Sequence, residues 1–529
     1  MNRASPSTVL PHALTASRPS ACPGLLRIVA ARDGGICRIK LPGGELAAVQ
    51  ARAIADASTK YAHGVIELTN RGNLQLRGVR AGHEAGLSAA LLRAGLGPVI
   101  AAGTAAEFAE PVESVESTES AASVEPAESG ASFAANDAGT PNTAALSSAD
   151  DVRNLMISPV AGRDPYALID TAPLGAELLA LLQSDARFAA LSPKFALLLD
   201  GGERLARLDH PHDVWLAASN GEDGVRFVFG LAGCPGPAGV ADVNAHGDAN
   251  ADTSADAAAP RDANANANGT GALAAVLPSH VPALVRAILH TFLDLAPADA
   301  TRMRDLLALQ SADALLQHAQ RYVDFPLARD ASLSHWQRPH AADAARRLGA
   351  HAQRHAGLWH VGGQPPLGRL DAATLRALAM LAQRHGNGRL HATPWQSVLL
   401  PEIPTRAVPA VLARLIALGL ACDPAEPIAH VIACAGSSGC AKGLADTKSD
   451  ALQLAAQLPA GIDVHLSGCP RSCAAAHCAP YTLLASAPGR YDLYQRDGGP
   501  GFGRRVANQQ TIDEAAALLA RLARSNPNA

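Results

Sequence analysis

Residues 45–78 read ELAAVQARAIADASTKYAHGVIELTNRGNLQLRG, and residues 369–402 read RLDAATLRALAMLAQRHGNGRLHATPWQSVLLPE. At an offset of 324 residues, Gly64 aligns with Gly388 and Thr69 with Thr393, and the hydrophobic pattern agrees over the whole length. An internal repeat of this kind predicts one structural unit built twice. The repeat is stronger evidence for the fold than for the function. An old duplication can persist simply because it folds.

Each copy of the repeat is predicted to contain a helix, two strands and a second helix, from its hydrophobic periodicity. The ranges are Ala48–Lys60, Val65–Thr69, Leu74–Arg77 and Glu84–Ala94 in the first copy, and Ala372–His385, Arg389–Thr393, Ser397–Leu400 and Ala407–Leu418 in the second. With a leading strand near Ile36–Leu41, each copy becomes a βαββα half-domain.

An α/β region is predicted after each half-domain. After the first copy we expect a helix near Leu174–Leu182 and strands near Phe195–Leu199, Val214–Ala218 and Val225–Phe229. After the second copy come His430–Ala435, a helix near Ala451–Leu458 and a strand near Ile462–Leu466. A helix-rich stretch, Val281–Tyr322, joins the two halves. The predicted fold class is therefore α+β with a pseudo-twofold duplication, and the site is expected where the copies meet.

Two low-complexity tracts are predicted to be disordered. Residues 101–150 are rich in Ala, Ser and Glu, and residues 240–272 are rich in Ala, Asn, Asp and Gly, so neither can bury enough apolar surface to fold. The predicted domains are 22–100 (first half-domain), 151–345 (first α/β domain, with the insertion), 346–427 (second half-domain) and 428–529 (C-terminal α/β domain).

Composition excludes several classes of protein. The formal net charge of −4 argues against nucleic-acid binding through a basic face. No run approaches 18 apolar residues, so no membrane span is expected, and residues 1–20 lack the apolar core of a signal peptide. Nine cysteines do not form a secreted disulfide framework. We expect a soluble cytoplasmic protein.

Four cysteines form two close pairs with the spacing C-x5-C, then 28 residues, then C-x3-C: Cys434, Cys440, Cys469 and Cys473. Paired thiols on a reduced chain favour a soft metal centre. Zinc knuckles space their pairs by two to four residues, whereas a [4Fe-4S] cube is bulkier and tolerates uneven spacing. The pattern favours the cluster, with a zinc site and plain buried cysteines as alternatives.

A polar stripe follows the first repeat. Arg71, Asn73, Gln75 and Arg77 are two residues apart, so on a strand their side chains would project from one face. Guanidinium forks match carboxylate geometry, which suits an anionic ligand with several carboxylates. The alternative is an ordinary solvent-exposed sheet face. In the second copy these positions are Trp395, Ser397, Leu399 and Pro401.

These motifs together resemble the nitrite and sulfite reductase superfamily. The cysteine spacing resembles its cluster motif, Arg71 and Gln75 match its T-x-R-x-x-x-Q segment, and Arg153 followed by Asn154 matches a later R-N segment. Lys194 matches the first of two lysines in a P-x-K-F-K-like segment, and the second is replaced by Ala196. The resemblance implies ferredoxin-like half-domains and a tetrapyrrole beside a [4Fe-4S] cluster.

Within this superfamily the chain resembles the precorrin-3B synthases most. The matching segments are Cys22–Arg27, Ala31–Gly35, Gly64–Arg71 and Leu191–Phe195. The resemblance implies a monooxygenase that uses O2 to hydroxylate precorrin-3A at C20 with γ-lactone formation, in aerobic cobalamin biosynthesis. It implies that Arg71, Asn73, Gln75, Arg77, Arg153 and Lys194 bind the tetrapyrrole, and that a mononuclear non-haem iron accompanies the cluster.

Several questions stay open at this point. No histidine among His63, His360, His391 and His477 stands out as an iron ligand, and a part for Cys478 is undecided. No G-x-G-x-x-G follows a strand, so a separate NAD(P)H-linked reductase is expected as electron donor. The alternatives are a sirohaem-dependent assimilatory sulfite or nitrite reductase and a non-catalytic iron–sulfur electron carrier.

Overall fold

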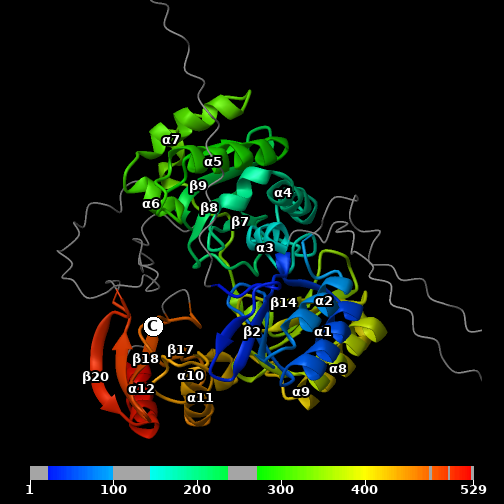
Figure 1. Ribbon diagram of the computed structural model, residues 1–529, viewed down its shortest axis with the longest axis vertical. Helices are drawn as coiled ribbons and strands as arrows, with labels where there is room; N and C mark the ends of the chain where they lie inside the picture. The colour runs from blue at the N-terminus through cyan, green and yellow to red at the C-terminus, as the bar shows by residue number, and fades with distance from the viewer. Residues whose placement is uncertain (1–21, 99–142, 236–270, 476–478, 498–500, 526–529) are drawn as a thin grey trace, which may run out of the picture.

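Four five-stranded sheets organise the part of the chain that the structure describes. A computed structural model describes residues 22–98, 143–235, 271–475, 479–497 and 501–525 (Figure 1). His477 and Cys478 lie outside these ranges, as do residues 101–142 and 240–270 of the two tracts predicted to be disordered. Within the described ranges, no helix is long and apolar enough to cross a membrane.

Two of the sheets belong to the repeat, and the copies exchange a strand. The first sheet has the order β1 (Val29–Ala31), β2 (Gly34–Ile39), β5 (Leu74–Val79), β4 (Val65–Leu68) and β13 (Arg369–Asp371). The second has the order β11 (Gly349–Ala352), β12 (Leu358–Gly363), β15 (Val398–Pro404), β14 (Arg389–Ala392) and β3 (Glu45–Ala47). Thus β13 of the second copy completes the first sheet, and β3 of the first copy completes the second.

The exchanged strands keep equivalent registers. Leu370 pairs with Ile66, and Leu46 pairs with Leu390, all four in antiparallel ladders and all buried. Leu46 and Leu370 are also aligned positions of the sequence repeat. The two half-domains therefore share backbone hydrogen bonds at one edge of each sheet. Separating the two copies would expose an unpaired edge strand in both sheets.

The helices of the repeat pack against each other in one core. α1 (Ala48–Tyr61) and α8 (Ala372–His385) lie side by side, and α2 (Glu84–Arg93) and α9 (Val408–Ala417) follow the last strands of the copies (Figure 1). Their apolar residues recur at helical spacing, as in the buried Ile54 of α1 and Leu378 of α8, and join one hydrophobic cluster. The Asp371 side chain caps α8 by accepting from the Thr374 N–H at 2.7 Å.

The α/β domains are also duplicates of each other. The first sheet has the order β6 (Leu155–Ile157), β7 (Leu197–Asp200), β8 (His212–Gly221), β9 (Gly224–Gly233) and β10 (Ala274–Val276). The second has β16 (Val431–Ala433), β17 (Val464–Ser467), β18 (Tyr481–Ala487), β19 (Arg490–Gln495) and β20 (Arg504–Gln510). In both sheets, the first three strands pair in parallel. The fourth strand pairs antiparallel with the third, and the fifth antiparallel with the fourth. The duplication therefore extends beyond the repeat that the sequence reveals.

Helices cover these sheets. α4 (Ala172–Ser184), α5 (Val281–Leu295), α6 (Met303–Leu307) and α7 (Ala312–Ala319) share a core with the first α/β sheet, and α11 (Thr447–Ala455) and α12 (Ile512–Ser525) share one with the second. The predicted helix-rich stretch that joins the halves is therefore part of the first α/β domain.

In the first α/β domain, hydrogen bonds join the loops that follow β6 and β7. The Ser158 hydroxyl donates to the Leu205 carbonyl at 2.7 Å, and the Arg204 N–H donates to Asp164 at 2.8 Å. Ser158 follows β6 as Cys434 follows β16, and Asp164 comes six residues later, as Cys440 does in the other domain.

One prediction was wrong at its boundary. Residues 143–150 were assigned to a disordered tract, but they form most of α3 (Thr143–Asp151). The helix is held by its acidic end, where Asp150 accepts from the Leu25 N–H and Asp151 pairs with Arg27 at 2.7 Å. These carboxylates offset the low apolar content that suggested disorder.

Two buried histidines of the second sheet make the fold sensitive to acid. Burial lowers the pKa of His360 and of His391 to about 3, helped by the neighbouring charges of His351 and Arg163. Since the unfolded chain binds these protons near pH 6.5, stability is full above that pH and falls as the pH drops toward 3. We expect a loss of about 2 kcal/mol per histidine at pH 5.

Urea unfolding midpoints at pH 7.5 and pH 5 measure this loss. In His360→Gln and His391→Gln the difference between the two midpoints should shrink, whereas His335→Gln, at an exposed position, should leave it unchanged. An unchanged difference in both buried-site variants would assign the acid sensitivity to other groups.

Candidate functional site

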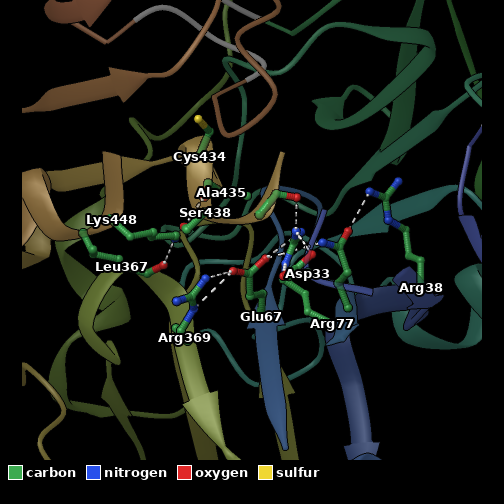
Figure 2. A network of polar contacts seen from close by, with 12 residues as sticks. Asp33, Arg38, Glu67, Arg77, Leu367, Arg369, Cys434, Ala435, Ser438 and Lys448 are labelled. Atoms are coloured by element: carbon green, nitrogen blue, oxygen red, sulfur yellow. Dashed lines mark hydrogen bonds and ion pairs between the residues drawn. The ribbon is translucent and has the colours of Figure 1, made fainter. Parts of the chain in front are cut away.

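A polar face of the first half-domain sheet lies against the cysteine loops of the C-terminal domain (Figure 2). Gln75 is paired with Arg38 on one side and with Glu67 on the other, so the three side chains are neighbours on one face. Arg38 Nη2 donates to Gln75 Oε1 at 3.1 Å, and Gln75 Nε2 donates to Glu67 Oε2 at 3.4 Å. Arg77, two residues further along β5, completes the face.

Arg77 connects the sheet to the first cysteine loop. Its Nε and Nη2 atoms donate to the two carboxylate oxygens of Asp33, both at 2.8 Å. Nη2 also donates to the Gly439 carbonyl at 2.9 Å, in the loop between Cys434 and Cys440. The residue is only 4% exposed. Its guanidinium is thus occupied by groups of the chain itself.

Glu67 is surrounded by cations from different parts of the chain. Arg369 on β13 donates to it at 2.7 Å, and Arg77 Nη1 lies 3.6 Å away. Burial alone would raise the pKa of Glu67, but the charges of Lys448, Arg77 and Arg369 lower it below its usual value. The carboxylate therefore stays ionised at the centre of the network, where Figure 2 shows it between Arg369 and Arg77.

The four cysteines lie at the ends of two parallel strands. Cys434 and Cys440 follow β16 and flank α10 (Gly436–Gly439), and Cys469 and Cys473 follow β17. Because β16 and β17 are parallel neighbours, their carboxyl ends meet at one edge. The pKa of Cys473 is raised to about 11, first by loss of solvation and then by the charges on the other three cysteines, so Cys473 is within electrostatic reach of all three.

The surroundings of these thiols fit a bulky iron–sulfur group. The Gly468 N–H donates to the Cys434 sulfur at 3.1 Å, the kind of amide contact that stabilises cluster sulfurs. Gly436 has φ +62, and a Cβ there would lie 2.6 Å from the Thr447 nitrogen. Across the described ranges, no three His, Cys, Asp or Glu side chains are grouped closely enough to hold a single metal ion.

Two residues of the predicted stripe are placed differently from expectation. Arg71 and Asn73 precede β5 in a turn, closed by the Gly72 N–H donating to the Thr69 carbonyl, with Gly72 at φ +69. The turn breaks the alternation that a continuous strand would give. Arg71 Nε donates to His210 Nε2 of the first α/β domain at 3.4 Å, and Asn73 Oδ1 accepts from the Leu41 N–H.

The two remaining predicted cations are Arg153 and Lys194. Arg153 pairs with Asp150 at 3.1 Å and donates to the Leu96 carbonyl at 3.2 Å. Lys194 is half-buried, and its backbone N–H donates to the Ser192 hydroxyl. The structure thus brings Gln75 and Arg77 to the cysteine loop and gives Arg153 a partner on its own chain.

Arg38 is the residue that sequence reasoning missed. Its only side-chain hydrogen bond among the described residues is the one to Gln75, and its buried Nε has no partner. Burial lowers the pKa of Arg38, while charges on Cys22 and Cys473 raise it, so its head group lies near the cysteines. The alternation of Cys37 and Ile39, both buried, could have placed Arg38 on the opposite face.

Comparison with protein families matches more than half of the chain. The nitrite/sulfite reductase ferredoxin-like half domain matches residues 30–94 and 351–418, and the nitrite and sulphite reductase 4Fe-4S domain matches residues 148–327. The chain belongs to the nitrite and sulfite reductase superfamily. The 4Fe-4S match covers the first α/β domain, and the four cysteines lie in the C-terminal domain of the same strand order.

Curated relatives fall into more than one activity. The chain is 28% identical to the ferredoxin–nitrite reductase of Synechococcus elongatus, over 85% of this chain and 76% of the relative. It is 26% identical to the precorrin-3B synthase of a Sinorhizobium species, over 97% of this chain and 90% of the relative. Both relatives are oxidoreductases, which supports the same class for this chain.

A solved structure supports the fold of this superfamily. The Mycobacterium tuberculosis NirA protein matches with a TM-score of 0.65 and 20% identity, over 93% of this chain and 80% of that one. The predicted duplicated fold with ferredoxin-like half-domains is therefore confirmed.

Gly436 and Gly461 both have a positive φ but differ in the space around them. Gly436→Ala should prevent the first cysteine loop from closing, whereas Gly461→Ala should not, because Gly461 has φ +77 but open space around it. Both variants bear a left-handed strain of about 1 kcal/mol, so only the steric clash differs. Iron and sulfide per chain after anaerobic reconstitution should fall in Gly436→Ala alone. Equal loading of both variants would contradict the close approach.

Proposed function

We propose that this chain is a precorrin-3B synthase, an O2-dependent monooxygenase that hydroxylates precorrin-3A at C20 and closes a γ-lactone. The supporting observation is the extent of the match: the precorrin-3B synthase aligns over 97% of this chain and 90% of its own length. The alignment with the nitrite reductase covers 85% and 76%.

The proposed substrate suits the polar face and its surroundings. Precorrin-3A carries several carboxylate arms, which guanidinium and ammonium groups bind with charge-assisted hydrogen bonds. In this proposal Arg38, Arg71 and Lys194 hold these arms, with Gln75 between them. Holding the macrocycle in one orientation lowers the entropic barrier to reaction at a single carbon.

Neutral groups near Arg71 also suit a large substrate. Burial and the charge of Arg71 lower the pKa of His212 to about 3, and burial also lowers the pKa of His210 well below its usual value. Ala196, which replaces a lysine of the superfamily motif, is buried. These neutral groups lower the positive charge around Arg71, which disfavours a small, highly charged anion.

The proposed cofactor is a [4Fe-4S] cluster on Cys434, Cys440, Cys469 and Cys473. A cluster of this kind supplies electrons one at a time, which dioxygen requires because it reacts slowly with closed-shell organic molecules. The mononuclear iron, and a separate NAD(P)H-linked reductase as electron donor, belong to the same proposal.

A sirohaem-dependent nitrite or sulfite reductase is the second candidate. It is favoured by the 28% identity to a ferredoxin–nitrite reductase and by 32% identity to a ferredoxin-dependent sulfite reductase of Mycolicibacterium paratuberculosis over 32% of this chain. In that case the polar face holds sirohaem and a ferredoxin supplies the electrons.

One experiment separates the two candidates. Protein purified anaerobically should contain iron and sulfide and absorb as a broad shoulder near about 400 nm without tetrapyrrole bands. Incubation with precorrin-3A, O2 and an electron donor should then add one oxygen atom to the substrate, measured by mass spectrometry. Strong sirohaem bands with reduction of nitrite or sulfite would reject the proposal in favour of the second candidate.

Two variants divide the site into its parts. Cys434→Ser should abolish the iron–sulfur absorption and the activity together.

Arg71→Ala should keep the absorption and weaken tetrapyrrole binding about tenfold, the effect of removing one charge-assisted hydrogen bond. Normal turnover in Arg71→Ala would remove Arg71 from the binding site.

A further inference from the structure

The network around Glu67 joins three parts of the chain that are far apart in the sequence. Glu67 and Arg77 belong to the first half-domain, Arg369 to the strand contributed by the second copy, and Lys448 to α11 of the C-terminal domain. Arg369 and Arg77 are ion-paired with Glu67. The Lys448 ammonium donates to the Leu367 carbonyl at 2.8 Å, just before β13 (Figure 2).

Both ends of the network reach the loop between Cys434 and Cys440. At one end, Arg77 donates to the Gly439 carbonyl, one residue before Cys440. At the other end, Thr447, which precedes Lys448, donates from its hydroxyl to the Cys434 carbonyl at 2.9 Å. The loop is therefore held on one side by Arg77, which is ion-paired with Glu67, and on the other by Thr447, whose neighbour Lys448 lowers the pKa of Glu67 through its charge.

The approach of Arg77 to this loop is close. A Cβ on Gly439 would lie 2.6 Å from Arg77 Nη2, so a side chain there would displace the guanidinium from its present position. Arg32 adds a second contact to the same loop by donating to the Ser437 carbonyl at 3.1 Å. The Nε and Nη2 atoms of Arg77 donate to Asp33. These donors are therefore used by the protein itself and not by a ligand.

We propose that Arg77 and Glu67 are positioning residues that hold the Cys434–Cys440 loop against the polar face, and that Arg77 is not a tetrapyrrole clamp. The inference rests on the four cysteines holding the cluster, as proposed above, but not on the identity of the reaction. Asp33 holds the guanidinium of Arg77 by two hydrogen bonds, and Glu67 adds an ion pair at 3.6 Å. Arg77 in turn fixes the loop that supplies two of the four thiolates.

The test compares cluster retention with ligand binding. Arg77→Ala, Glu67→Gln and Arg71→Ala are reconstituted anaerobically, and the loss of cluster absorption to an iron chelator is followed in time. Binding of uroporphyrin, a stable octacarboxylate tetrapyrrole, is measured by titration on the cluster-loaded proteins. Arg71→Ala is the matched control, because it removes the same group from a residue without a contact to the loop among those observed.

We expect Arg77→Ala to lose the cluster about tenfold faster than the parent, the factor for one charge-assisted hydrogen bond. Glu67→Gln should also lose it faster than the parent but by a smaller factor, because Asp33 still holds the guanidinium. Their affinity for uroporphyrin should stay within about threefold of the parent, whereas Arg71→Ala should show the reverse pattern. Glu67→Gln keeps the size of the side chain and decides the test should Arg77→Ala fail to fold.

The opposite result would overturn the inference. If both network variants keep the cluster as long as the parent, and Arg77→Ala loses affinity as Arg71→Ala does, Arg77 is a clamp. These measurements use neither precorrin-3A nor O2, so failure of the inference is separate from failure of the proposed reaction.

Discussion

The exchange of β3 and β13 between the two half-domain sheets is the constraint on which the rest of the structure depends. Each short strand completes the sheet of the other copy, and its leucine enters the shared core. The exchange also has an electrostatic consequence, because β13 brings Arg369 next to Glu67. The same backbone pairing that unites the copies therefore supplies a charge to the network beside the cysteine loop.

The two copies have the same architecture but different surfaces. The first sheet presents Gln75 and its charged neighbours to the cysteine loops. At the position aligned with Gln75, the second sheet has Leu399, which packs with Val160 and Leu205 of the first α/β domain. The same topology therefore produces a polar contact in one half and an apolar contact in the other.

The sequence predicted the parts of the fold that carry periodic patterns. The helices and longer strands of the repeat were found near their observed positions, as with Ala372–His385, which matches the observed helix at both ends. Strands β3 and β13 were missed because three residues carry too little pattern. An α/β region was expected after each half-domain, but the strand order that the two regions share was not, since it lies in topology and not in residue identity.

The candidate site was predicted in part for similar reasons. Cysteine spacing is a local signal, so the four thiols could be selected from sequence. The partners of Arg77 could not, because Asp33, Glu67 and Gly439 are brought together only by the sheet and the packing of the C-terminal domain. The turn at Gly72 likewise redirected Arg71, which a uniform alternation could not reveal.

The shared topology of the α/β domains gives them unequal requirements during maturation. In the first, Ser158 and Asp164 tie the loops after β6 and β7 by hydrogen bonds available as soon as the chain folds. In the second, the equivalent positions are Cys434 and Cys440, for which we propose an inorganic cross-link. Under that proposal, iron supply limits completion of only one domain, and a newly made chain can assemble most of its framework before the metal arrives.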